Sequence, residues 1–249
     1  MRRELRFPRG FLWGAASSSH QCEGGCTNNQ WYRWEQQGHI LSGEQCGDAA
    51  NWWVAAERDF EFAEQMENTA LRLSLEWSRI EPQEGQWDSA AIDRYRAMLT
   101  DLRRRGMRPV VTLHHFTEPL WFADRDGFAD AANIPLFVRY VEHAITALSD
   151  LCDFWITVNE PNIYAVQGYD AAQILANGLK AVGGDLAKRD QLAAAMRKTA
   201  VDSPRGRFTL SAAGNPVQDM YLREVKGNNN ELRSVAVKAL ADPARGCKL

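Results

Sequence analysis

The chain has 249 residues, of which 45% are hydrophobic and 24% charged, and its formal net charge is −3 at pH 7. These values are ordinary for a globular protein of one large or two modest domains, and the acidic balance argues against a nucleic-acid partner. No apolar run approaches the roughly 18 residues that a membrane-spanning helix needs, so no membrane association is expected.

Strands and helices alternate in the first two thirds of the sequence. We expect Asp48 and Ser89 to cap the first and second helices, and Gly106 to end the second. In chain order the expected elements are a strand over 11–19, a helix over 48–66, a strand over 69–77, a helix over 89–106, a strand over 108–116, a helix over 133–150 and a strand over 153–161.

Each of these four expected strands carries polar residues at its carboxyl end. Alternating strands and helices imply a parallel sheet, and chemistry at the carboxyl ends of parallel strands is typical of a (β/α)₈ barrel. We therefore predict an α/β fold with four βα units, which is half of such a barrel. The polar ends are His20-Gln21, Glu76, His114-His115 and Asn159-Glu160.

After residue 169 the pattern and the composition both change. Helices are expected over 170–184 and 188–200, followed by short strands that begin near 207, 217 and 231, with a turn at 227–230. All nine Trp and all five His lie at or before Trp155, whereas all six Lys lie after 169. The asymmetry predicts a domain over 1–169 and a separate small α/β segment over 170–249.

The five cysteines form no metal-ligand pattern. Cys22 and Cys26 could begin a metal loop, but neither a second Cys pair nor a His-x-x-His completes it. The first 14 residues lack the apolar region of a signal peptide, so reduced thiols and a cytoplasmic location are expected. We expect neither a metal nor an organic cofactor.

Four segments in the first 169 residues resemble glycoside hydrolase family 1, the β-glucosidase family. They are FLWGAASSSHQCEG, LRLSLEWSRIEP, VTLHHFTEPLW and FWITVNEPNIYAVQGY, and they follow the order of the family. The resemblance implies a (β/α)₈ barrel that hydrolyses small β-glycosides. Where the family often has a tryptophan after the second histidine, this chain has Phe116.

The resemblance also assigns roles to individual residues. It implies Glu160 as the general acid/base and Asn159 as the partner of the sugar 2-hydroxyl. It places Gln21 and His115 at other sugar hydroxyls, and Arg72 beneath the reaction centre. Acetal hydrolysis needs such a proton donor at the leaving oxygen, so we expect Glu160 to face a sugar-sized hollow at the rim of the sheet.

The chain lacks a recognisable second catalytic carboxylate. Retaining hydrolysis needs a nucleophile roughly 5–5.5 Å from the acid, yet the family's later Thr-Glu-Asn-Gly-type motif is absent. Glu23, Glu76 and Glu118 are the nearest alternatives, and water with another carboxylate as base would invert the product. A half barrel also has two open sheet edges, which invite pairing with a second copy that could supply the missing group. We therefore expect weak hydrolysis. The alternatives are a non-catalytic carbohydrate-binding or assembly module and an inactive chimera.

The tail of the chain resembles a different family. Residues 168–249 are similar to the C-terminal end of periplasmic solute-binding proteins of the branched-chain amino-acid type, chiefly through DSPRG and NPVQD. The resemblance implies a mostly structural role, with the join near Gly168-Tyr169.

Four other features have ordinary structural explanations. Trp52-Trp53 is expected to anchor a helix in the core, and His114 to be structural because adjacent strand residues face opposite ways. The run 103–105, three arginines, is expected to be a solvated helix end, and Glu76 and Glu118 to be surface or salt-bridged carboxylates.

Overall fold

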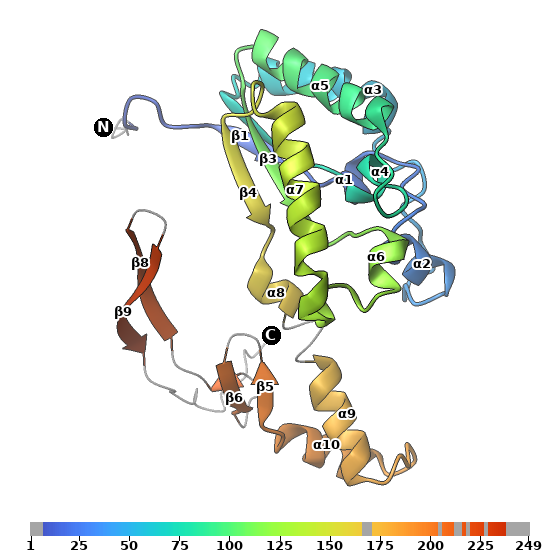
Figure 1. Ribbon diagram of the computed structural model, residues 1–249. Coiled ribbons are helices and arrows are strands. Elements are labelled where there is room, and N and C mark those ends of the chain that lie inside the picture. The colour runs from blue at the N-terminus through green and yellow to red at the C-terminus, as the bar shows by residue number, and fades with distance from the viewer. Residues whose placement is uncertain are drawn as a thin grey trace, which may run out of the picture. The chain divides into compact units, whose positions relative to one another are not determined.

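The computed structural model describes residues 7–165, 171–203, 206–211, 216–217, 220–226 and 229–237. The chain forms two compact units, Met1–Asn159 (unit 1) and Glu160–Leu249 (unit 2). Figure 1 shows their elements.

Unit 1 is built on a four-stranded parallel sheet. Its strands are β1 (Gly14–Ala16), β2 (Ala70–Ser74), β3 (Arg108–His114) and β4 (Phe154–Val158), and they lie side by side in chain order. The register pairs Gly14 with Ala70, Ala70 with Arg108, and Val110 with Phe154. This arrangement confirms the predicted partial (β/α)₈ barrel.

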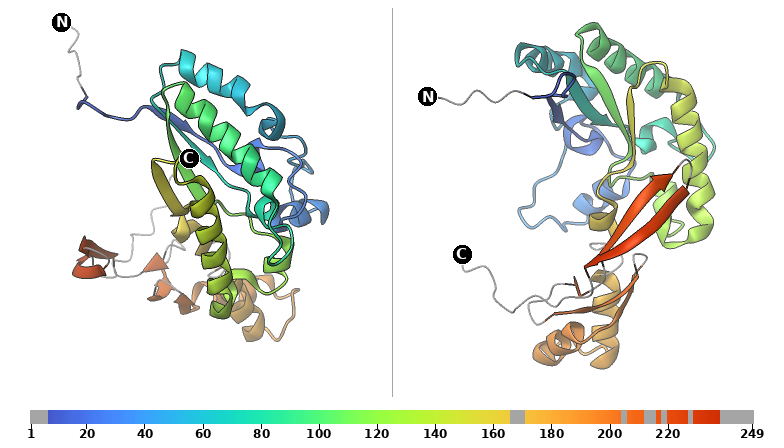
Figure 2. Two further views of the ribbon diagram at one scale, coloured as in Figure 1. Left: turned by 45° about the horizontal axis from the view of Figure 1, so that its top comes forward. Right: turned by 90° about the vertical axis from the view of Figure 1, so that its left-hand side faces the viewer.

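Three long helices cover one face of this sheet, as Figures 1 and 2 show. They are α3 (Trp52–Gln65), α5 (Ser89–Arg104) and α7 (Ile134–Leu148). Helix α5 packs against α3 and α7, and the apolar faces of all three are buried with the outward residues of β2 and β3. The fully buried side chains of this core include Phe60, Tyr95, Leu99, Tyr140 and Leu148.

Two of the predicted helix caps are wrong. Helix α3 begins at Trp52, three residues later than expected for an Asp48 cap, and its N-cap Asn51 has a left-handed backbone without a side-chain cap. Helix α5 is capped by Asp88 and not by Ser89, because the Asp88 carboxylate accepts hydrogen bonds from the second and third helical N–H groups. The predicted stop at Gly106 is confirmed by its φ of +78°.

The strands end earlier than predicted because their polar residues turn into short helices. These are α1 (Ser19–Cys22) after β1 and α4 (Trp77–Ile80) after β2. A segment of short turns follows β3, and α2 (Gln30–Gln36) lies between α1 and α3. The turns after β3 are α6 (Leu120–Ala123), η1 (Gly127–Ala129) and η2 (Ala131–Asn133).

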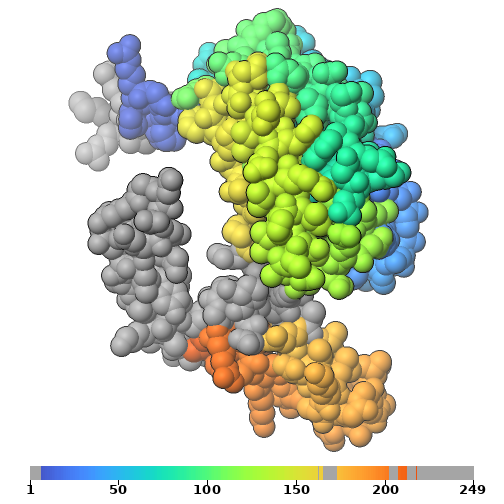
Figure 3. Space-filling model, in the orientation of Figure 1, coloured from blue at the N-terminus to red at the C-terminus, as the bar shows by residue number. Residues whose placement is uncertain are grey.

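Strands β1 and β4 are the two edges of the sheet. Strand β1 approaches β2 closely because residue 14 is glycine: a Cβ there would lie 2.3 Å from the Ala70 carbonyl oxygen. Every residue of β4 is at least partly exposed, and Figure 3 shows yellow atoms of this part of the chain at the surface.

Unit 2 contains helices and short strands, as the sequence pattern predicts, and these strands pair antiparallel. Two of its helices, α9 (Ala171–Ala181) and α10 (Arg189–Arg197), pack together where Gly178 meets Leu192 and Met196. The other elements are α8 (Pro161–Ala165), β5 (Val201–Ser203), β6 (Gly206–Leu210), β7 (Pro216–Val217), β8 (Met220–Lys226) and β9 (Asn229–Val237).

Some predictions for the tail fall on residues that the structure does not describe. The join at Gly168-Tyr169 and the first half of the turn at 227–230 lie outside the described residues, and the second half of that turn opens β9. The division into 1–169 and 170–249 stays a prediction. The observed boundary between the two compact units lies earlier in the chain, at Asn159.

Candidate functional site at the carboxyl edge of the sheet

An arginine links three strands at the carboxyl edge of unit 1. Arg72 extends from β2 and donates from Nε to Thr112 Oγ1 of β3 at 2.8 Å. It also donates from Nη2 to Asn159 Oδ1 at 2.6 Å, just beyond β4. Asn159 is buried, and its backbone N–H donates to the His114 carbonyl oxygen. The guanidinium therefore fixes the orientation of the Asn159 amide.

His115 lies close enough to Arg72 to respond to its charge. Burial, then the charges of Arg72 and His114, lower the pKa of His115 to about 4. Its Nδ1 is buried without a hydrogen-bond partner among the described residues. At neutral pH the ring is therefore uncharged, and one nitrogen can donate while the other accepts.

Glu160 follows Asn159 directly. Its backbone has a φ of +42°, and its carbonyl accepts a hydrogen bond from the Tyr164 N–H at the start of unit 2. The residue is exposed. The expected sugar-sized hollow around it stays a prediction, because four strands wall only one side of a barrel mouth.

Gln21 is not joined to this group. It lies exposed on α1, and its Oε1 accepts a hydrogen bond from Ser18 Oγ at 2.7 Å. The structure thus brings together three of the predicted site residues of unit 1, Arg72, His115 and Asn159, and leaves the role of Gln21 a prediction.

The loop after His115 has an unusual backbone conformation, which hydrogen bonds from helix α2 stabilise. Phe116 has a φ of +70°, in the left-handed region. Its carbonyl oxygen accepts hydrogen bonds from Gln30 Nε2 at 2.7 Å and Trp31 Nε1 at 3.1 Å. Two side chains of helix α2 therefore hold in place the loop that carries His115.

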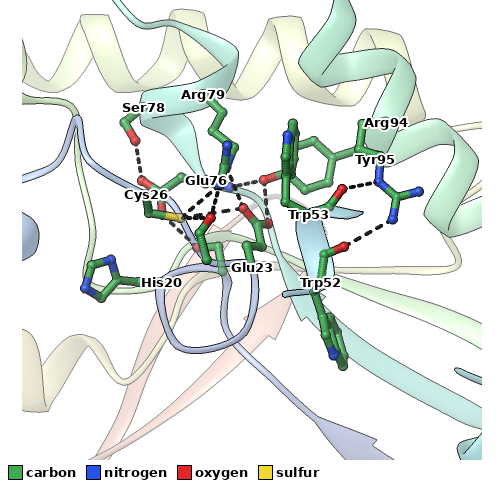
Figure 4. A network of polar contacts seen from close by, with 12 residues as sticks. His20, Glu23, Cys26, Trp52, Trp53, Glu76, Ser78, Arg79, Arg94 and Tyr95 are labelled. Atoms are coloured by element: carbon green, nitrogen blue, oxygen red, sulfur yellow. Dashed lines mark hydrogen bonds and ion pairs between the residues drawn. The ribbon is translucent and has the colours of Figure 1, made fainter. Parts of the chain in front are cut away.

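A buried polar network next to this edge was missed by sequence reasoning. The Glu23 carboxylate accepts from Arg79 Nε at 2.9 Å and from the Tyr95 hydroxyl at 2.7 Å, and Arg79 also lies 3.9 Å from the Trp53 ring centroid. Burial, reinforced by Glu76 and opposed by Arg79, raises the pKa of Glu23 to about 7. Figure 4 shows these groups converging, and burial also raises the pKa of the neighbouring Cys26 thiol.

Glu76 and Glu118 are not surface carboxylates. Glu76 is fully buried, and Glu118 is buried with His114 Nε2 3.8 Å from its carboxylate. Four donors surround the Glu76 carboxylate: Ser19 Oγ, Thr117 Oγ1 and Ser78 Oγ at 2.6–2.9 Å, and Asn29 Nδ2 at 3.3 Å. Such a saturated carboxylate is suited to holding loops together and poorly suited to attacking a substrate. Both glutamates lie in the same motifs as predicted site residues, so the motifs alone do not show that they are buried. The signal that was missed is the set of hydrogen-bond donors around them.

The other structural interpretations are confirmed, except that Arg105 of the arginine run is not solvated. Trp52 is buried, with its ring edge-on to Phe60, and His114 packs against Phe128 and Phe137 while His115 lies near Arg72. In the arginine run, the first two residues are exposed at the end of α5, and Arg105 pairs with Asp101 and Glu64.

Within the described residues, no three His, Cys, Asp or Glu side chains gather closely enough to hold a metal ion. Four of the five cysteines lie in this part of the chain, all as free thiols. None of the described helices has both the length and the apolar character that crossing a bilayer requires.

Comparison with known proteins identifies the family of the chain. The family model for glycosyl hydrolase family 1 matches residues 3–195. The chain belongs to this family. The match includes the whole predicted site and continues past residue 169, into α10. The likeness of the tail to solute-binding proteins stays a prediction.

Family 1 relatives resemble the chain over part of their length. Human cytosolic β-glucosidase is 34% identical over 175 residues, which are 67% of this chain and 37% of the human protein. A β-glycosidase from Pyrococcus horikoshii is 35% identical with a TM-score of 0.63, over 78% of this chain and 44% of that one. A mutant of rice β-glucosidase Os3BGlu6, solved in a covalent complex with Glc, is 33% identical with a TM-score of 0.63, over 66% and 36% of the two chains. The chain thus spans about two fifths of such family 1 proteins.

Proposed function

We propose that the chain hydrolyses small β-glycosides, with Glu160 as general acid/base. The observation that carries this proposal is the Arg72–Asn159 hydrogen bond at the carboxyl edge of the sheet, immediately before Glu160, in a member of family 1. It supports a sugar-binding edge because it orients the amide that directly precedes Glu160 in the sequence.

The polar groups have complementary tasks in this proposal. Arg72 occupies Asn159 Oδ1, so the amide is oriented to donate from Nδ2 to a sugar hydroxyl. Neutral His115 binds a second hydroxyl, because an uncharged ring at half-buried depth keeps both a donor and an acceptor. Glu160 gives its proton to the leaving oxygen as the glycosidic bond breaks.

The second carboxylate determines how fast this chemistry runs. Glu23 is tied to Arg79 and Tyr95, and Glu76 to four donors, so neither is offered as the nucleophile. The rice relative was solved in a covalent complex with Glc, and this observation does not identify a nucleophile in the present chain. With one acid alone, we expect acceleration of roughly 10²–10⁴-fold, weak for a glycosidase. A second copy of the chain is the proposed partner, because two sheet edges are open.

The test compares hydrolysis of an aryl β-glucoside by the unaltered chain and by Glu160→Gln. The amide cannot donate the proton, so the rate should fall by roughly 10²-fold or more. Glu142→Gln, an exposed position on α7, is the matched control and should keep full activity. Equal rates for the unaltered chain and Glu160→Gln would reject Glu160 as the acid.

A second candidate function is carbohydrate binding without catalysis. The exposure of Glu160 favours it, because no enclosed pocket of described residues excludes water from this carboxyl group. Calorimetric binding of a β-glucoside by both the unaltered chain and Glu160→Gln, with no hydrolysis by either, would select this function.

The cellular setting follows from the same observations. We propose a cytoplasmic location, supported by the free thiols of the described residues and by the relative named a cytosolic β-glucosidase. Fractionation of the native host should find the protein with cytoplasmic enzymes, and recovery from an oxidising compartment would contradict it.

A further inference from the structure

One buried carboxylate joins three loops at the carboxyl end of the unit 1 sheet. Glu76 follows β2, and its Oε2 accepts from Ser19 Oγ and Thr117 Oγ1, both at 2.9 Å. Its Oε1 accepts from Ser78 Oγ at 2.6 Å and from Asn29 Nδ2 at 3.3 Å. Figure 4 shows Glu76 within the buried polar network. Three of its four donors come from distant parts of the sequence, so this carboxylate is where separate loops meet.

Two of these loops carry residues that are predicted to bind sugar hydroxyls. Thr117 lies two residues beyond His115, and Ser19 opens α1, which also carries Gln21. A hydrogen bond that fixes one residue of such a short segment limits how far the neighbouring side chains can move. The contacts of Glu76 therefore bear on two positions of the predicted site.

The backbone between His115 and Thr117 is strained. Phe116 has a φ of +70°, and a non-glycine residue keeps such a conformation only where its surroundings hold it. On one side, the Thr117 hydroxyl donates to Glu76. On the other, the Phe116 carbonyl accepts from α2, and the N-cap of α2, Asn29, also donates to Glu76. Both restraints on the strained backbone thus lead to the same carboxylate.

We propose that Glu76 is a positioning residue, which fixes the His115 loop and α1 in the arrangement that binds a sugar. Its effect on hydrolysis rests on the proposed function, whereas the contacts themselves lie within unit 1. A carboxylate suits this task because it only accepts hydrogen bonds, so both of its oxygens can serve donors at once. Bonds to a charged acceptor are also roughly twice as strong as bonds between neutral groups.

Glu76→Gln tests this role because it keeps the size of the side chain and removes its charge. One oxygen becomes an N–H donor, so the groups on that side lose a charged acceptor and the loops should loosen. Sugar binding should weaken in the substrate and transition-state complexes alike. The KM for an aryl β-glucoside should therefore rise roughly fivefold to tenfold with kcat little changed. A mere loss of folded protein would instead lower kcat at constant KM.

Glu81→Gln is the matched control. Glu81 is also fully buried, and its carboxylate accepts from Trp77 Nε1 at 2.8 Å, from the Gly85 N–H at 2.7 Å and from Arg139. These donors belong to α4, the turn after it and α7, so the substitution removes an equally buried charge away from the site loops. It should lower the urea midpoint as Glu76→Gln does, and it should leave KM unchanged.

A second readout does not require hydrolysis. Burial, more than the charges of Arg72 and His114, lowers the pKa of His115 to about 4 from an ordinary value of 6.5. A loosened loop admits water to the ring, so NMR titration of the imidazole in Glu76→Gln should find this pKa raised toward the ordinary value. Loss of the negative charge alone would lower the pKa, so a rise reports movement of the loop. Glu81→Gln should leave the pKa unchanged.

Thr117 offers a second pair of variants in case Glu76→Gln does not fold. Thr117→Val keeps the shape of the side chain and removes its donor, so KM and the pKa of His115 should both rise. Thr117→Ser restores the donor and should restore both values. A folded Glu76→Gln with the KM and the His115 pKa of the unaltered chain would overturn the positioning role, as would a loss confined to kcat. If the unaltered chain hydrolyses nothing, the proposed function is rejected, and the His115 titration alone decides the positioning role.

Discussion

At the residue scale, the most informative group is a carboxylate that the chemistry does not use. Glu23 is buried against Arg79, Tyr95 and Glu76, and its pKa is raised to about 7 from an ordinary value of 4.5. Below pH 4.5 the group is protonated in both folded and unfolded chains. As pH rises toward 7 the unfolded chain releases this proton first, so the stabilising contribution of Glu23 is progressively lost.

We predict that Glu23→Gln flattens the pH dependence of stability. From pH 5 to pH 8 the free energy of unfolding of the unaltered chain should fall, with Glu23 contributing up to about 3 kcal/mol. Urea denaturation at the two pH values measures this difference, which should be smaller in Glu23→Gln. The exposed Glu61→Gln should behave as the unaltered chain. If the difference in unfolding free energy between pH 5 and pH 8 is the same in Glu23→Gln as in the unaltered chain, another group causes the pH dependence.

The sequence predicted which side chains gather at the carboxyl edge of the sheet, and it did not predict what surrounds them. Arg72, His115 and Asn159 were predicted from motifs and do gather at one edge. Glu76 lies in one of the same motifs, yet its burial among four donors was not predicted, because three of those donors come from other segments of the chain. Gln21 shows the converse: it is a motif residue whose hydrogen bond comes from Ser18, the N-cap of its own helix.

At the element scale, the periodicity predicted the long helices and the order of strands, and local chemistry decided their ends. Asp88 and Ser89 are both good N-caps, and sequence alone does not rank them. In the structure Asp88 has an extended backbone and accepts from Ala90 N at 2.8 Å and Ala91 N at 3.3 Å. The strand ends were predicted too long because the polar residues after β1 and β2 form helical turns.

The cap assignment gives a direct prediction. Asp88→Ala removes the acceptor for two helical N–H groups and should lower the free energy of unfolding by about 1 kcal/mol. Ser89→Ala, at the first helical residue, should change it by a few tenths of a kcal/mol only. Chemical denaturation of both variants measures the difference, and a larger loss for Ser89→Ala would restore the original assignment.

At the scale of the whole molecule, the break in composition near residue 170 predicted two parts, and the contacts divide the chain at Asn159. The two boundaries differ for a physical reason. A change in composition marks where the type of sequence changes, whereas the boundary of a compact unit is set by which residues pack together. The likeness to family 1 extends to residue 195, beyond both boundaries.

Association with a second copy, the proposed partner, would make stability depend on concentration. If two copies associate, dilution favours the separated chains, so the melting temperature should rise with protein concentration. Calorimetry over a hundredfold range of concentration measures this. A constant melting temperature for the unaltered chain would contradict a folded dimer.

The glycine at position 14 gives β1 an influence beyond its three residues. A Cβ there would sit 2.3 Å from the Ala70 carbonyl oxygen, too close for any contact between these atoms. Gly14→Ala alters neither charge nor catalytic groups, yet it forces β1 or the Ala70 backbone to move. Separation of the first strand from the sheet would thus originate from a single added carbon, at the opposite end of β1 from the residue that pairs with Arg72.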